Sequence, residues 1–296
     1  MDLFTAGKPF FKGNLHCHTT LSDGRLTPEE AKQFYRERGY DFLTLTDHRH
    51  LSEPTHMEDG MLVLSGMEAD YFLPAEVVHM VCFGWEESLR QEPDMPLPRN
   101  PQQCIDLVRK HGGRVILAHP AWSLNTIETM GGLKGVSATE IYNSMSGVPW
   151  NGDRADSSTQ IDIAASHGIF FNLVASDDSH RYDGEAGKSF TMIQADELTR
   201  ESLLEAFDAG RFYCSQGPAF EQISVEDGQI TVQCSPVEHI VFYSNVVWSG
   251  ERCQSGHGIT NAVYHALDLP GRTDQFVRIQ LIDAQGRSAW SNPIIF

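Results

Sequence analysis

The sequence predicts an α/β protein in two parts, a (β/α)-type domain over residues 1–216 and a small antiparallel β-sandwich over 217–296. In the first part, short apolar runs typical of strands alternate with helical segments, and this alternation favours a parallel sheet. The strands are apolar nearly throughout, as expected when both faces of a sheet are covered. About seven such units indicate a closed barrel, although the pattern is also compatible with an open sheet.

Capping residues and helix-terminating glycines mark the predicted helices of the first part. Thr27 can cap a helix whose first turn holds Pro28, Glu30 completes a capping box, and Gly39 suits the C-terminal stop. The predicted helices are residues 26–39, 100–113, 155–168 and 198–210. The predicted strands are residues 10–16, 41–48, 61–70, 76–85, 114–120, 138–144, 169–180 and 188–195.

The pattern changes after about Gly217. Short alternating runs over residues 222–235, 239–251 and 276–290 predict antiparallel strands, and "EDGQ" and "DAQGRS" are typical hairpin turns. No convincing helix follows. This part therefore predicts a small β-sandwich appended to the α/β domain.

Composition limits the classes of partner. The chain has 22 Lys and Arg against 40 Asp and Glu, a net charge of −18, which disfavours binding of long duplex nucleic acid. A small anionic substrate remains compatible if bound metal ions make the site positive. Six cysteines without a CxxC pair exclude a zinc ribbon and favour a reducing compartment. No membrane span or signal peptide is evident, so we expect a cytoplasmic protein that does not bind membranes.

Metal-ligand side chains occur where the predicted strands end. Two histidines flank one residue in "NLHCHTTLSDG", and residues at positions i and i+2 of a strand point the same way. The C-terminal ends of barrel strands converge on one face, so ligands distant in sequence would meet there. The candidate metal ligands are His16, His18, Asp23, His48, Glu68, His79, His119, Asp178 and His180.

Nine ligands are too many for one ion. Six of the 13 histidines follow the strand-end pattern, whereas structural histidines would be scattered. Imidazole and carboxylate mixtures suit Zn, Mn or Fe, so the sequence predicts two or three divalent ions. A cluster of this kind suits hydrolysis, because it lowers the pKa of a water and stabilises charge on a phosphoryl oxygen.

The motifs "HCHTTLSDG", "TDH", "GME", "VHM", "AHP" and "DSH", in this order, resemble the PHP (polymerase and histidinol phosphatase) family over roughly residues 10–215. The resemblance implies a distorted (β/α)7 TIM-like barrel with a trinuclear metal centre. It implies that His16, His18, Glu68 and Asp178 hold one ion and that Glu68 bridges to a second ion. That second ion would be bound by His79 and His119, and the third by Asp23, His48 and His180.

The resemblance further implies a phosphoesterase that acts on a phosphomonoester, a nucleotide or a short oligonucleotide. We expect no catalytic group beyond the metal-activated water to be essential. Arg49, Arg154 and Arg181 are weaker candidates for neutralising phosphate oxygens, and His50 for protonating the leaving group.

Two other readings remain open from sequence. An amidohydrolase-type metal hydrolase also opens with HxH on a barrel strand, but it generally shows a single late Asp and often a bridging lysine at a strand end. A non-catalytic binding or regulatory module with a decayed site is a second alternative, although all nine ligand positions carry suitable residues.

Overall fold

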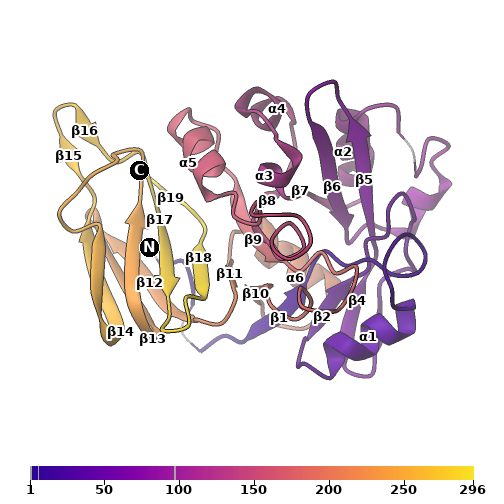
Figure 1. Ribbon diagram of the computed structural model, residues 1–296, viewed down its shortest axis with the longest axis horizontal. Coiled ribbons are helices and arrows are strands. Elements are labelled where there is room, and N and C mark those ends of the chain that lie inside the picture. The colour runs from indigo at the N-terminus through magenta and orange to yellow at the C-terminus, as the bar shows by residue number, and fades with distance from the viewer. Residues whose placement is uncertain (1, 6, 97) are drawn as a thin grey trace.

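The computed structural model describes residues 2–5, 7–96 and 98–296. These residues form two large open sheets with helices packed around them, and a separate two-stranded sheet of β15 (Asp268–Leu269) and β16 (Arg272–Thr273) (Figure 1). The larger sheet has the strand order β12-β13-β17-β18-β11-β10-β1-β2-β4-β3, and the second has the order β5-β6-β7-β8-β9. The strands of the first part that belong to the larger sheet are β1 (Phe10–Asn14), β2 (Phe42–Thr44), β3 (His56–Glu58), β4 (Met61–Leu64), β10 (Phe190–Gln194) and β11 (Phe212–Ser215). The second sheet is built from β5 (Gly66–Phe72), β6 (Val77–Phe83), β7 (Arg114–Leu117), β8 (Ala138–Asn143) and β9 (Asn172–Ser176).

A closed, parallel barrel was the wrong expectation for these strands. The single predicted strand 61–70 is divided between the two sheets, because β4 ends at Leu64 and β5 begins at Gly66. At Gly66 a side chain would collide with the larger sheet, since an added Cβ would lie 2.2 Å from Thr44 Cγ2. From there a hairpin without a helix joins β5 to β6, so these neighbours run antiparallel, as do β6 and β7. The second sheet is therefore mixed rather than parallel. The larger sheet is also mixed, because β1 pairs in parallel with β2 and antiparallel with β10.

The two sheets meet along a seam at the ends of their strands. Isolated bridges join His48 to Glu68 and Cys17 to Ser179 across it. Backbone hydrogen bonds reinforce the second bridge: the His18 N–H donates to the Ser179 carbonyl at 2.9 Å, and the Asp178 N–H donates to the His16 carbonyl at 3.0 Å. The seam thus brings together chain segments that carry the sequence motifs.

All four predicted helices are present, as α1 (Pro28–Arg36), α2 (Pro101–Lys110), α5 (Ser158–Ser166) and α6 (Arg200–Asp208). The capping box of α1 forms as expected between Thr27 and Glu30. The structure adds three elements too short to be recognised by periodicity: α3 (Pro120–Ser123), α4 (Ile127–Gly132) and the 3₁₀ helix η1 (Glu87–Gln91). No helix of the described residues is long and apolar enough to cross a membrane.

The C-terminal strands are antiparallel, as predicted, but they continue the larger sheet through the pairing of β11 with β18. One 15-residue strand, β13, replaces two predicted strands, and β14 was missed because most of its side chains are exposed. The remaining strands are β12 (Phe220–Glu226), β15 (Asp268–Leu269), β16 (Arg272–Thr273), β17 (Phe276–Ile282), β18 (Ser288–Ser291) and β19 (Ile294–Ile295), with β13 at Gln229–Tyr243 and β14 at Cys253–His265.

Two buried contacts connect the C-terminal strands to the second sheet and its helix. The Arg278 guanidinium, almost fully buried, makes two 2.6 Å hydrogen bonds to the Asp162 carboxylate on α5. Trp290 stacks on Tyr142 of β8, with ring centroids 5.6 Å apart. The C-terminal strands therefore support the side of the second sheet that carries β8.

Candidate metal centre

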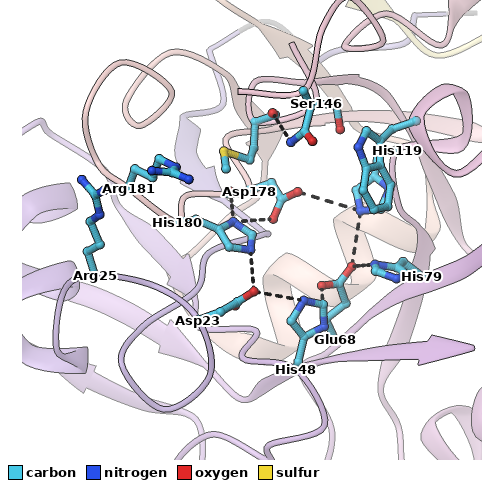
Figure 2. A pocket seen from close by; sticks show the side chains of 13 residues that line it. Asp23, Arg25, His48, Glu68, His79, His119, Ser146, Asp178, His180 and Arg181 are labelled. Atoms are coloured by element: carbon cyan, nitrogen blue, oxygen red, sulfur yellow. Dashed lines mark hydrogen bonds and ion pairs between the residues drawn. The ribbon is translucent and has the colours of Figure 1, made fainter. Parts of the chain in front are cut away.

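All nine predicted ligand side chains lie together at the seam, and Figure 2 shows seven of them around one cavity. The larger sheet supplies His16 and His18 from the end of β1, Asp23 from the following loop, and His48 from beyond β2. The second sheet supplies the rest, which are Glu68 on β5, His79 on β6, His119 after β7, and Asp178 and His180 after β9.

The innermost group consists of His16, His18, Glu68 and Asp178. The two histidine Nε2 atoms lie 3.3 and 3.2 Å from Glu68 Oε2, and 3.2 and 3.1 Å from Asp178 Oδ1. Ligand atoms around a tetrahedral zinc ion with bonds near 2.1 Å would be separated by roughly 3.4 Å. The spacing of these four atoms therefore suits coordination of one cation.

Several polar atoms of this inner group lack a hydrogen-bond partner among the described residues. His16 Nε2, His18 Nε2 and Asp178 Oδ1 are buried and have no hydrogen-bond partner among the described residues. A buried polar atom without a partner costs roughly 1–3 kcal/mol, and more when it is charged. A divalent ion between them would remove that cost for all these atoms at once.

A second group forms on the other oxygen of Glu68. Glu68 Oε1 lies 3.0 Å from His79 Nδ1 and 3.4 Å from His119 Nε2. Because Oε2 faces the inner group, the two oxygens of this carboxylate point to different sets of histidines. Glu68 therefore belongs to both groups of ligand atoms.

The third group is more open. Asp23 Oδ2 lies 3.4 Å from His180 Nε2 and 3.9 Å from His48 Nε2, and His18 is close enough to join them. The Asp23 side chain is 55% exposed, against 1% for Glu68. This group lies at the mouth of the cavity (Figure 2).

The electrostatics of the site favour positive charge. Burial opposes protonation of His16, but the carboxylates of Asp178, Glu68 and Glu140 outweigh it and hold the pKa of this imidazole well above its ordinary value. Burial likewise opposes protonation of His180, yet Asp178 and Asp23 raise its pKa to about 9. Without metal, protons on His16 and His180 thus balance part of the charge of the buried carboxylates.

Sequence reasoning missed Glu140, which is fully buried in β8. Its Oε1 accepts a 2.8 Å hydrogen bond from His16 Nδ1, an arrangement that directs the Nε2 lone pair of His16 toward the inner group. Its Oε2 accepts from the His119 backbone N–H at 2.8 Å and from Asn143 Nδ2 at 2.7 Å. A carboxylate in the middle of a predicted internal strand is the signal that could have identified it.

Other outer contacts fix the remaining ligands. The Ser123 hydroxyl lies 2.9 Å from His119 Nδ1, and the carbonyl of Asp178 accepts a 2.7 Å bond from His180 Nδ1. Two ligands hold left-handed backbone conformations, His119 at φ 31° and Asp178 at φ 54°. Non-glycine residues in this region are strained, and such strain is concentrated at functional sites.

The neighbouring acidic residues Asp47 and Asp177 have structural contacts instead. Asp47 accepts hydrogen bonds from the backbone N–H and the hydroxyl of Thr19, both at 2.7 Å. Asp177 accepts from Tyr35 and from the backbone N–H groups of the 187–189 turn. Burial raises the pKa of Asp177 to about 6 despite these hydrogen bonds. Of the adjacent pair, Asp178 therefore faces the histidines.

The cavity over these groups measures about 480 Å³. Its lining includes Arg25, which sequence reasoning missed, and Arg181, one of the four weaker candidates. Neither guanidinium has a hydrogen-bond or ion-pair partner among the described residues, and that of Arg181 lies 4.2 Å from the centre of the Trp150 ring. In Figure 2 both lie on the His180 side of the cavity, opposite His79.

The other three weaker candidates do not line this cavity. The Arg49 guanidinium is bound to the Asp70 carboxylate at 2.7 Å, and that hydrogen bond raises its pKa. His50 lines a separate hollow beside Pro28 and Leu51. Arg154 lines a smaller adjoining hollow.

No family model and no curated protein matches this sequence. A solved two-domain protein from Bacteroides vulgatus, described as containing a predicted PHP-like metal-dependent phosphoesterase, is similar with a TM-score of 0.54 at 14% identity. The likeness covers 99% of this chain and 97% of that one.

Two other solved structures are less similar. A predicted metal-dependent phosphoesterase from Bifidobacterium adolescentis has a TM-score of 0.43 at 17% identity, covering 57% of this chain and 87% of its own. An amidohydrolase from Chromobacterium violaceum, solved with bound sulfate and no metal, has a TM-score of 0.44 at 16% identity, covering 68% and 96%. At these identities the similarity concerns the fold alone. The Bacteroides vulgatus protein shares a mixed α/β fold with this chain over 97% of its length, and this confirms the resemblance to PHP-like proteins at the level of the fold.

Proposed function

We propose that this chain is a metal-dependent hydrolase that cleaves a phosphoester of a small compound, such as a phosphomonoester, a nucleotide or a short oligonucleotide. The supporting observation is the inner group, where buried ligand atoms of His16, His18 and Asp178 have no hydrogen-bond partner among the described residues. Asp178 and Glu68 of this group line an open cavity. Such an arrangement is typical of catalytic metal sites, which keep a position open for water or substrate.

The proposed centre holds two or three divalent ions of Zn, Mn or Fe. His16, His18, Glu68 and Asp178 would hold the first, and Glu68 would bridge to a second bound by His79 and His119. Asp23, His48 and His180 would hold the third. The bound ions would supply Lewis acidity toward phosphoryl oxygens and would lower the pKa of a water molecule in the cavity.

The chain's own cations would bind and orient the phosphate. Arg25 and Arg181 line the cavity with free guanidiniums, which match phosphate oxygens in bidentate geometry. Stacking of Arg181 on Trp150 restricts its rotamers before substrate arrives. The net charge of −18 disfavours long duplexes, so the proposed partner is a small anion attracted by the local positive charge of this site.

The proposal also concerns how the fold serves the site. We infer that the two open sheets together correspond to a distorted (β/α)7-like barrel that is not closed by continuous strand pairing. The reason is that the candidate ligands still converge from the ends of strands in both sheets. The C-terminal strands, with their own buried apolar cluster, would act as a sandwich-like domain that supports β8 and α5.

A chelation and reconstitution experiment tests the proposal. Protein stripped of metal and reloaded with Mn²⁺ or Zn²⁺ is expected to release phosphate from at least one member of a panel of nucleotides, sugar phosphates and short oligonucleotides. Asp178→Asn should abolish this release, whereas Asp183→Asn, an exposed change in the same loop, should not alter it. Phosphate release that is independent of metal, or that survives in Asp178→Asn, would contradict the proposal.

A further inference from the structure

A second hollow of about 420 Å³ adjoins the metal cavity across a single side chain, Trp122. Trp122 lines both spaces, so its indole forms their common wall. The second hollow is otherwise lined by Leu73, Ala75, Glu76, Val77, Ser123, Leu124 and Arg154. It lies beside the turn between β5 and β6 and the short helix α3, on the His79 side of the metal centre.

The position of Trp122 is fixed by the metal-ligand framework. Helix α3 has only four residues, and it is bounded by His119 at φ 31° and Leu124 at φ 58°. The Trp122 ring lies 4.9 Å from the His119 ring and 5.6 Å from the His79 ring, measured between centroids. The indole therefore lies beside the His79 and His119 rings, at the edge of the metal cavity that is opposite Arg25 and Arg181.

The chemistry of the hollow is mainly apolar. Leu73 and Leu124 are 39% and 51% exposed, so the hollow has aliphatic surface that a ligand could cover. Leu124 is also held in a left-handed conformation that is unusual for a bulky residue. Strained backbone conformations are concentrated at binding and active sites, and the strain at Leu124 keeps an apolar side chain at the rim of this hollow.

The two charged residues of the hollow, Glu76 and Arg154, carry opposite charges. The Glu76 carboxylate accepts hydrogen bonds from the Thr129 hydroxyl at 2.6 Å and from the Thr126 N–H at 3.1 Å. The guanidinium of Arg154 has no partner among the described residues. The Arg154 backbone N–H donates to the carbonyl of Ser146, which lines the metal cavity, so this loop connects the two spaces on a second side.

We propose that this hollow binds the leaving group, and that the natural substrate is a phosphoester of an alcohol that carries a flat, apolar ring. The ring would stack on Trp122 and cover Leu73 and Leu124, while Arg25 and Arg181 hold the phosphate on the opposite side of the cavity. This inference rests on the proposed phosphoesterase function. Aromatic stacking together with burial of apolar surface supplies the selectivity.

Binding of phosphonates tests the subsite without turnover, because their P–C bond is not hydrolysed. By calorimetry on metal-loaded protein, naphthylmethylphosphonate is expected to bind at least about tenfold more tightly than methylphosphonate, the size expected for stacking plus burial. Trp122→Ala and Leu124→Ala should each reduce this preference, and Trp122→Phe should retain most of it. Trp248→Ala, which removes an exposed tryptophan in the C-terminal strands, is the matched control and should leave the preference unchanged.

The outcomes separate the subsite from the activity. Equal affinity for the two phosphonates, or a preference that is unchanged in both Trp122→Ala and Leu124→Ala, would overturn the leaving-group subsite while leaving the phosphoesterase proposal intact. Failure of both phosphonates to bind, together with no phosphate release from any ester, would contradict the proposed function and this inference with it. Loss of the preference in Leu124→Ala alone would support the subsite even if Trp122→Ala fails to fold.

Discussion

The two sheets that meet at the seam supply different chemistry to the same centre. Each sheet contributes three of the six histidines, but their carboxylates differ. The one carboxylate of the larger sheet, Asp23, is 55% exposed on a loop. The second sheet contributes Glu68 and Asp178, whose side chains are 1% and 7% exposed, and the fully buried Glu140 behind them. Buried negative charge is costly unless it is compensated, so the carboxylates of the second sheet create most of the need for cations, and histidines of both sheets would complete the proposed coordination.

This difference predicts that the largest effects come from the buried carboxylates of the second sheet. Glu68→Gln and Asp178→Asn should each lower metal affinity by more than the roughly 10–100-fold typical of an outer partner. Phosphate release should fall below detection, because each carboxylate contacts histidines of more than one group. Metal titration and phosphate-release assays measure the two effects. Near-normal metal affinity in either variant would contradict the dominant role of the buried carboxylates of the second sheet.

Glu140→Gln tests whether the second sheet also acts from behind the ligands. The amide keeps the shape of the carboxylate but removes the charge that holds the proton on His16 Nδ1. We expect metal affinity to fall by about 10–100-fold with little change in Tm of the metal-free protein. An equal loss of stability and affinity would instead assign Glu140 a purely structural role.

Asp23→Asn, on the exposed side, should have a smaller effect. The side chain is more than half exposed, and its loop can readjust around the third group. We expect loss of about one ion per chain and a decrease in activity nearer tenfold, the size of a single charged hydrogen bond. Complete loss of every ion in this variant would show that the open group controls the buried ones, contrary to the comparison.

The pH dependence of stability provides a finer test. In the metal-free chain the pKa of His180 is raised to about 9, so its stabilising charge is fully present below about pH 6.5 and is lost as the pH rises toward 9. Metal binding requires His180 to lose its proton, so the affinity for metal should rise between about pH 6.5 and 9. Thermal melts should therefore show the metal-free protein losing stability from pH 6.5 to 9 while the stabilisation by metal grows.

Parallel slopes for the metal-free and metal-loaded protein would show that the seam histidines are not the groups that exchange protons for metal. A variant that lacks this histidine, His180→Gln, is the control, since its metal-free melting curve should lose part of the pH dependence.

Sequence reasoning selected nine side chains that the structure brings together at the seam, because each of them lies in or just after a predicted strand, a local pattern that does not depend on how the sheets close. The caps of α1, with Thr27 and Glu30, are equally local. The division of the strands between two open, mixed sheets was not predictable from such local patterns. It depends on the crossing at Gly66 between two sheets and on the hairpin that makes β5 and β6 antiparallel, and both are decided by packing between distant segments.

The supporting residues were missed for the same reason. Glu140 and Arg25 carry no motif, and their roles arise from what the fold places opposite them. Arg49 and His50 followed a motif directly, yet the chain turns them toward Asp70 and toward a separate hollow. Proximity in sequence to a predicted ligand therefore does not decide position in the cavity, since Arg25 and Arg181 also lie within two residues of one and do line it.

The most direct test of the central claim is the metal content of the purified and reconstituted protein, measured by elemental analysis. The account predicts two or three Zn, Mn or Fe ions per chain in the wild type and a clear reduction in Asp178→Asn. Less than one ion per correctly folded chain after reconstitution would contradict the assignment of the seam as a polynuclear metal centre.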